Sequence, residues 1–433
     1  MISDIWVSKT KIVLITLALI AVFFPYISPI HTPSDTQPWA LVFALLLLLV
    51  ICYEQREKFF RNIPGPLKML GIIFIYTGIV FFVHLFFLKD ADFVLGLRSI
   101  FGYFSLIILT YFGFKFWQDI PGTFFIGAVG AWFIGAIDQV FFGFGIFAPL
   151  LHRFATGGFR GFKYFAPGFT SFAPEPAFYA TMCIYFLILN EFLYKQKKYS
   201  PASYIGIVIV LLTQIVMSYS GVGLMMLLLF LLGKGIELLV IKSNSREKKV
   251  QATVLVLSLI VVSLFLFNKS LNQSRSGALL QTSVTEPSAL ADDTSVTNRL
   301  GNPVLALYGG IFKTYGIGFG LGTKSTEALP SWLDKLTGGH GVWGGRIEGG
   351  FSQTIYELGI VGFILIGIIL YIIGKSIIYG REYRGALIIS FMTAFVSLFI
   401  FGAIANPLAG LLLGIHLYFA SNKNESFNHN PSL

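Results

Sequence analysis

Long apolar runs joined by loops of alternating charge constrain this fold more than any other feature of the sequence. The basic loops each contain two or more lysines and arginines and lie at residues 56–68, 195–198, 242–249 and 375–384. Loops between them, at residues 31–38, 218–220 and 401–404, have neither lysine nor arginine. Because cytoplasmic loops of membrane proteins retain Lys and Arg, this alternation predicts a membrane location and an orientation. It places the long polar stretch 269–350 outside the cytoplasm.

The composition agrees with membrane insertion. Hydrophobic residues make up 55% of the 433 residues and charged residues 12%, whereas a soluble domain carries about 25% charged residues. Runs of about 20 apolar residues cross roughly 30 Å of hydrocarbon, and there they must be helical to satisfy their own backbone groups. The sequence therefore predicts an all-α polytopic membrane protein with about 12 transmembrane helices. Topology explains most of the net charge of +10, so we expect no nucleic-acid partner.

The apolar runs also predict the order of segments along the chain. Residues 1–142 should contain transmembrane helices 1–5, residues 143–174 a first outer loop, residues 175–268 helices 6–9, residues 269–350 a large outer loop, and residues 351–433 helices 10–12 and a tail. The expected spans are 11–30, 39–53, 68–88, 94–116, 121–142, 175–194, 202–217, 219–241, 250–268, 351–374, 385–401 and 404–420. Both termini are then cytoplasmic. The outer loops are rich in aromatic residues, so we expect short or re-entrant helices in them.

A first group of candidate functional residues lies around the start of the sixth expected span. Glu175 stands between two prolines at a helix start, where a carboxylate complements the helix dipole or serves as a base at the membrane edge. Arg153, Arg160 and Lys163 precede it on the same side. Arginines on the outer side are unusual, because Lys and Arg of membrane proteins are enriched in cytoplasmic loops. The planar guanidinium group is suited to binding a phosphate diester. Ordinary solvation of the loop remains the alternative.

A second group lies in the large outer loop. It consists of Arg299, the glycine run 316–322, His340, Arg346 and Glu348. The glycines allow close approach of the backbone to a ligand or to a neighbouring helix. His340 is a candidate general base near neutral pH, or a bystander. Arg346 and Glu348 are candidates for the membrane surface, or for a simple salt-bridged pair.

Arg98 is the remaining candidate, near the outer end of the fourth expected span. A cation at that depth costs roughly 2–3 kcal/mol unless it is paired or reaches the surface, and Asp92 and Asp138 are candidate partners. His84 and His416 are expected to form hydrogen bonds between helices. Lys234 is expected inside a span, and the charged groups that could act on a substrate are otherwise expected almost entirely at the outer face. The sequence has no HExxH or Cys/His cluster, so we expect neither a metal nor another cofactor.

Two stretches of this sequence resemble the bacterial O-antigen ligase/polymerase superfamily. NRLGNPVLALYGGIFKTYGIGFGLGTKS is similar to the arginine-to-GxGxG segment of that family's large periplasmic loop, and GGFSQTIYELGIVGFILIGIIL is similar to its E-x-G segment at the start of the next span. The order of spans and loops also fits from about residue 153 to residue 413. The resemblance implies a multi-pass protein of the bacterial inner membrane that acts on undecaprenyl-diphosphate-linked oligosaccharides.

Three departures from the ligase pattern favour a polymerase of repeat units. Ligases place a histidine about ten residues before the Glu of E-x-G, whereas His340 lies seventeen residues before Glu357. The N-P-N stretch of ligases is replaced by Glu175-Pro176-Ala177. Their S-R-G stretch is replaced by residues 218–221, which have no arginine.

The resemblance also implies different roles for the candidate residues. The basic side chains would bind the diphosphate of the lipid-linked donor, and these are Arg98, Arg153, Arg160, Lys163, Arg299 and Arg346. Glu175, Glu348 or His340 would accept the proton of the attacking sugar hydroxyl. Membrane lipid and a chain-length regulator protein are further candidate partners. The alternatives are a ligase that transfers polysaccharide to a lipid acceptor and a transporter or flippase for a lipid-linked sugar.

Overall fold

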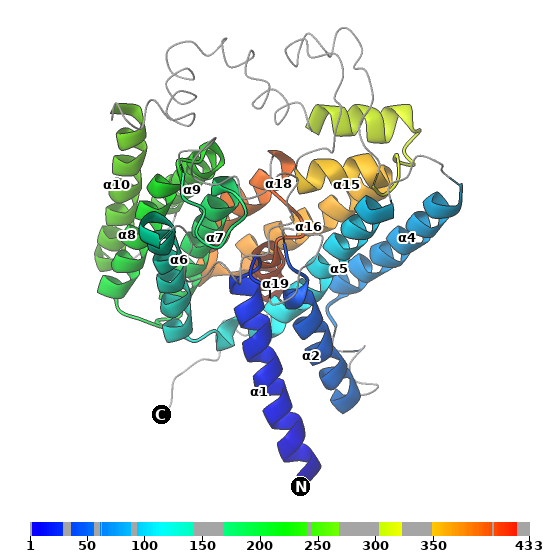
Figure 1. The fold of residues 1–433 in the computed structure, drawn as a ribbon, viewed down its shortest axis with the longest axis horizontal. Helices are drawn as coiled ribbons and strands as arrows, with labels where there is room; N and C mark the ends of the chain where they lie inside the picture. The colour runs from blue at the N-terminus through cyan, green and yellow to red at the C-terminus, as the bar shows by residue number, and fades with distance from the viewer. Residues whose placement is uncertain are drawn as a thin grey trace.

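The protein is an all-helical assembly in the part of the chain that the structure describes. The computed structural model describes residues 2–28, 36–55, 61, 63–87, 93–142, 168–240, 245–267, 303–322, 349–400 and 402–421, and within these ranges there is no strand (Figure 1). Its main helices are α1 (Ile2–Phe23), α2 (Trp39–Gln55), α4 (Gly65–Phe87), α5 (Phe93–Phe116), α6 (Gly122–Phe142), α7 (Pro176–Lys195), α8 (Pro201–Ser218), α9 (Gly221–Val240), α10 (Ser245–Phe267), α15 (Gly350–Leu358), α16 (Ile360–Tyr379), α17 (Arg384–Ser390), α18 (Val396–Ile400) and α19 (Pro407–Ser421).

The membrane character predicted from the sequence is supported. Among the described residues, 8 helical stretches are long and apolar enough to cross a membrane. α4 carries large hydrophobic side chains that are well exposed at helical spacing, including Ile72 at 66%, Ile75 at 65% and Ile79 at 57%. Such a stripe is unfavourable in water and favourable against lipid. Helices occupy all twelve expected intervals, although not all of them meet these criteria, so the number of spans stays a prediction.

The prediction of one continuous helix over 351–374 is wrong. Gly359, with φ 59° and ψ −130°, separates the short helix α15 from the candidate span α16. Near the end of the chain, residues 391–395 form a π-helical turn between α17 and α18. The short loop predicted at residues 218–220 is present, and in it Tyr219 adopts a left-handed conformation between α8 and α9.

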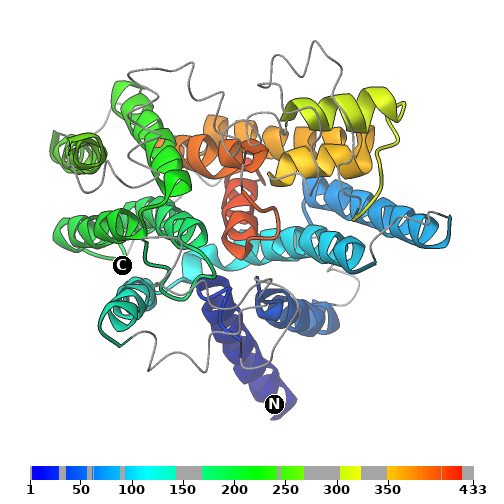
Figure 2. The same ribbon diagram turned by 45° about the horizontal axis from the view of Figure 1, so that its top comes forward.

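Two groups of helices lie on opposite sides of α19. The bundle α7–α10 occupies one side of the view, and α4, α5, α15 and α16 occupy the other (Figures 1 and 2). α19 packs along α5 and against α16. The α5–α19 crossing is close because Gly113 lies against the backbone of Leu411, and Gly414 lies against that of Thr110. Small residues allow helices in lipid to gain packing contacts at short range.

Candidate functional site

The candidate site is built around the break between α15 and α16. The break leaves backbone groups of Tyr356, Glu357 and Ile360 without partners inside a continuous helix. The glycine segment, defined here as residues 316–322, replaces those partners. Phe319 N donates to Tyr356 O and Gly320 N donates to Glu357 O, both at 2.9 Å, and Ile360 N donates to Gly316 O, also at 2.9 Å. A broken helix can therefore be stable near lipid, since the backbone N–H and C=O groups at the break form hydrogen bonds with the glycine segment.

Two glycines show why this segment needs residues without side chains. A Cβ on Gly318 would lie 2.5 Å from the carbonyl oxygen of Glu357, so a larger residue would push the segment off the helix end. Gly320 has a φ of +89°, and a Cβ there would overlap the imidazole ring of His84 on α4. The sequence is compatible with two roles for these glycines, close approach to a ligand and close approach to a neighbouring helix. The structure shows the second.

A buried carboxylate fastens the break to α5. Glu357 is 1% exposed and accepts hydrogen bonds from Ser99 Oγ at 2.8 Å and Tyr103 OH at 2.9 Å. Gln353, one turn earlier on α15, donates from Nε2 to Glu357 Oε1 at 2.7 Å. Gly322 N lies 3.4 Å from the same oxygen. A carboxylate so fully engaged with donors suits positioning better than proton transfer.

Arg98 lies on a different face of α5 from Ser99 and Tyr103, which bind this carboxylate. It is exposed, on a face of α5 that it shares with Val94 and Phe101, whose exposed fractions are 57% and 54%. Its neighbour in the sequence, Ser99, is buried and bonds to Glu357. No hydrogen bond joins Arg98 to the candidate partner Asp138, because neither carboxylate oxygen of Asp138 has a hydrogen-bond partner. The other candidate partner, Asp92, lies outside the described residues.

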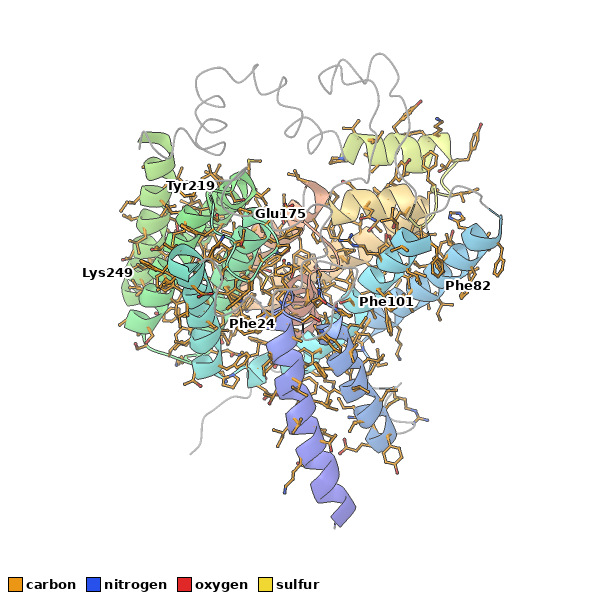
Figure 3. The ribbon with its side chains drawn as sticks, in the orientation of Figure 1. Phe24, Phe82, Phe101, Glu175, Tyr219 and Lys249 are labelled. Atoms are coloured by element: carbon orange, nitrogen blue, oxygen red, sulfur yellow. The ribbon has the colours of Figure 1, made fainter. Side chains whose placement is uncertain are left out.

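Glu175 occupies the N-cap position of α7. Its backbone is extended, with φ −144° and ψ 157°, and its side chain is exposed and makes no capping hydrogen bond. The preceding turn is held by Gln139 Oε1, which accepts from Thr170 N at 2.7 Å and from Ser171 N at 3.1 Å. Glu175 and Tyr219 both lie toward the upper end of the α7–α9 bundle in Figure 3. The carboxylate therefore sits at the helix N-terminus with its oxygens left for a ligand or for water.

The remaining predicted site residues cannot be placed. Arg153, Arg160, Lys163, Arg299, His340, Arg346 and Glu348 all lie outside the described residues. Their convergence with Arg98 and Glu175 into one site stays a prediction.

A buried ionic network lies in the α7–α10 bundle, and it corrects the expectation that charged groups gather almost entirely at the outer face. The network comprises Glu191, Tyr204, Lys234, Glu237 and Gln251. Lys234 Nζ lies 2.7 Å from Glu191 Oε2 and 3.1 Å from Glu237 Oε2, and it also donates to Gln251 Oε1. Tyr204 OH donates to Glu191 Oε1. Lys234 was expected inside a span, but Glu191 and Glu237 were missed, although ionisable residues inside apolar runs are rare.

Burial and the charge of this network change the pKa of a tyrosine in the loop between α7 and α8. Tyr199, between α7 and α8, donates its hydroxyl proton to Asn190 Oδ1. Burial, and then the negative charge of Glu191, raise the pKa of the Tyr199 hydroxyl well above its usual value. Tyr199 therefore stays a donor throughout the physiological pH range.

The two histidines inside the apolar helices α4 and α19 differ from each other. His416 bridges helices as predicted, because Nδ1 lies 2.6 Å from Ser376 Oγ on α16 and Nε2 lies 3.1 Å from Ser390 Oγ on α17. For His84 the prediction is wrong at Nδ1, which has no hydrogen-bond partner. The His84 ring instead packs on the glycine segment at Gly320.

Comparisons with protein-family models, with curated proteins and with solved structures find no match to this chain. Inference about its function therefore depends on the residues and on their geometry. The described part of the site offers a rigid junction of α5, α15 and the glycine segment. Beside that junction is an exposed arginine on an apolar face, which is a suitable position for an anionic group attached to a lipid.

Proposed function

We propose that this chain is a membrane glycosyltransferase that polymerises undecaprenyl-diphosphate-linked oligosaccharide repeat units on the periplasmic face of the bacterial inner membrane. One observation carries the proposal. The two stretches that resemble the O-antigen ligase/polymerase superfamily, around residues 316–322 and 350–362, are hydrogen-bonded to each other in one unit. Residues with a shared task in a binding site are expected to meet in this way although the sequence separates them.

The basic side chains of the site would bind the donor diphosphate. Arg98 already lies on an exposed apolar face, where the phosphates of a lipid-anchored donor are within reach of a membrane-facing guanidinium group. Arg160, Arg299 and Arg346 would complete the set, with Arg153 and Lys163 beside them. Positive charge beside the diphosphate stabilises the negative charge that the diphosphate gains as it leaves with the bonding electron pair.

The transfer step needs a base and no further reactant. The base takes the proton of an acceptor sugar hydroxyl, the hydroxyl oxygen bonds to the anomeric carbon of the donor, and the bond from that carbon to the diphosphate oxygen breaks. Glu175 is the described candidate for the base, because its carboxylate is exposed and makes no capping bond. Glu348 and His340 remain the others. Glu357 is assigned a positioning role through Ser99, the residue next to Arg98.

Reconstitution with a synthetic lipid-diphosphate repeat unit tests the proposal. We expect wild type to build a ladder of polymer, and Arg98→Ala, Arg160→Ala, Arg299→Ala and Glu175→Gln each to reduce the rate at least tenfold. Arg381→Ala is the matched control, since Arg381 is exposed in a loop predicted to be cytoplasmic. No ladder from the wild-type protein would overturn the polymerase, and equal ladders from all variants would overturn the site. Transfer of polymer to an added lipid acceptor would indicate the ligase instead.

The buried ionic network favours a second candidate, a transporter or flippase for a lipid-linked sugar. Such proteins use charged groups inside the membrane and broken helices, and this chain has Lys234 with two glutamates and the break at Gly359. Proteoliposomes carrying a fluorescent lipid-linked sugar separate the two functions. Protein-dependent movement of the sugar between leaflets without any new glycosidic bond would favour the transporter.

A further inference from the structure

A cluster of exposed apolar side chains lies just before the glycine segment. Phe312 is 72% exposed, Tyr315 is 93% exposed and Ile317 is 67% exposed. This apolar turn, defined as residues 312–317, begins in the last two residues of a short helical stretch at Pro303–Lys313. Three large apolar groups within six residues would be unfavourable in water. The turn needs an apolar surrounding that the described part of the chain does not supply.

The outward direction of the turn is fixed by the fold. Tyr315 has a φ of 54°, a left-handed conformation that is uncommon for a residue with a large side chain. Thr314 holds the turn from both sides, because its Oγ1 donates to Gly310 O at 2.7 Å and accepts from Gly318 N at 2.9 Å. The exposure of Tyr315 is therefore a feature of an ordered turn with its own hydrogen bonds.

A backbone hydrogen bond gives the depth of the turn. Gly316 O accepts from the N–H of Ile360, the first residue of the candidate span Ile360–Tyr379. Gly316 is thus level with the first residue of that candidate span. The surface also continues from the turn onto α16, since Ile360 and Phe363 are 51% and 56% exposed, and a Cβ on Gly316 would lie 2.5 Å from Ile360 Cδ1.

We propose that residues 312–317 are seated in the bilayer, at the boundary between the headgroups and the acyl chains of the leaflet where α16 begins. An aromatic ring with a hydroxyl group is suited to that boundary, where one end of the side chain is apolar and the other is wet. Residues 312–317 are then attached to the bilayer by their own side chains as well as through the hydrogen bond to α16. This inference does not depend on the enzymatic activity.

Depth-dependent fluorescence quenching tests the proposal in proteoliposomes of the full chain. A Cys52→Ser background leaves Cys183, which is buried and cannot be labelled. Single sites Tyr315→Cys and Ile317→Cys receive an environment-sensitive fluorophore. We expect strong quenching by a nitroxide attached near the lipid headgroup, weak quenching by one near the bilayer centre, and at least threefold less quenching by aqueous iodide than at Lys198→Cys. Lys198 is an exposed loop residue, and Phe363→Cys is the lipid-facing control.

Two results would overturn the proposal. Iodide quenching at residues 315 and 317 equal to that at Lys198→Cys would place the turn in water. Shielding from iodide without quenching by lipid nitroxides, lost as the protein is diluted into more lipid, would show that a second copy of the chain covers it. The labelled sites are exposed, so the replacements should leave the fold intact, and circular dichroism of each variant checks this.

Discussion

The Glu357 cluster and the Lys234 network are both buried, yet they stabilise a carboxylate in different ways. Glu357 is held by neutral donors, the hydroxyls of Ser99 and Tyr103 and the amide of Gln353. Glu191 is held by the ammonium group of Lys234. The first cluster joins a broken helix to a segment of backbone, and the second joins intact helices. A counter-charge together with the hydroxyl of Tyr204 compensates the buried Glu191, whereas, among the described residues, neutral hydrogen-bond donors alone surround Glu357 beside the helix break.

The largest expected effect is in the ionic network. Lys234→Met leaves Glu191 and Glu237 buried without their cation, which should lower the free energy of unfolding by about 3–5 kcal/mol. Thermal unfolding in detergent measures the change, with the exposed Lys198→Met as the matched control. Adding Glu191→Gln and Glu237→Gln to Lys234→Met should restore part of the loss. A melting temperature unchanged by Lys234→Met would mean that the glutamates are not charged in the folded protein.

The next effect tests the glycine segment. Gly320→Ala combines a positive φ with overlap of the His84 ring, so we expect a loss of about 2–3 kcal/mol. Gly367→Ala is the control, because a Cβ there meets nothing within 4 Å. Adding His84→Ala should relieve the overlap and leave only the backbone strain. If the double variant is no more stable than Gly320→Ala, the ring does not limit the segment.

A smaller effect is expected from the charge of Glu357. Glu357→Gln keeps the shape of the side chain but weakens its bonds from Ser99 and Tyr103, at a cost of about 1.5–2 kcal/mol. In the reconstituted polymerase assay the same variant should lower the turnover number more than the affinity for the donor, because it loosens α5 without removing Arg98. Full activity together with reduced stability would show that Glu357 stabilises the fold and has no role in the reaction.

The smallest effect compares two buried serines. Ser376→Ala removes the partner of His416 Nδ1 and should cost about 1 kcal/mol. Ser258→Ala removes a buried hydroxyl that has no hydrogen-bond partner, so it should be neutral or slightly stabilising. Thermal unfolding of the two variants side by side measures the difference. Equal destabilisation would show that packing, and not the bond to His416, sets the cost at Ser376.

The two clusters also differ in how far the sequence could predict them. Hydropathy located the helices because lipid dictates the length and composition of a span. The charges at Glu191, Lys234 and Glu237 stand inside apolar runs and were visible without a structure. The Glu357 cluster was not, because Ser99 and Tyr103 lie more than 250 positions from Glu357 and belong to an ordinary apolar run.

The break at Gly359 could not be predicted either. The run through residues 351–374 looks like one helix, and the groups that stabilise its interruption come from about forty positions earlier in the chain. Such a pairing is decided by tertiary structure and not by local preference. Of the candidate site, the sequence singled out the two stretches, Glu357 within the E-x-G segment, and Arg98, but not the hydrogen bonds that fasten Glu357 to α5.

The shortness of α15 has a consequence for biogenesis. Its nine residues rise about 13 Å, less than half of the roughly 30 Å that an inserted helix must cover. The insertion machinery therefore has no reason to partition α15 into the bilayer by itself. Residues 316–322 are synthesised first and must wait for α15 and α16 to arrive, so this corner of the protein is completed only after the spans around it are already in place.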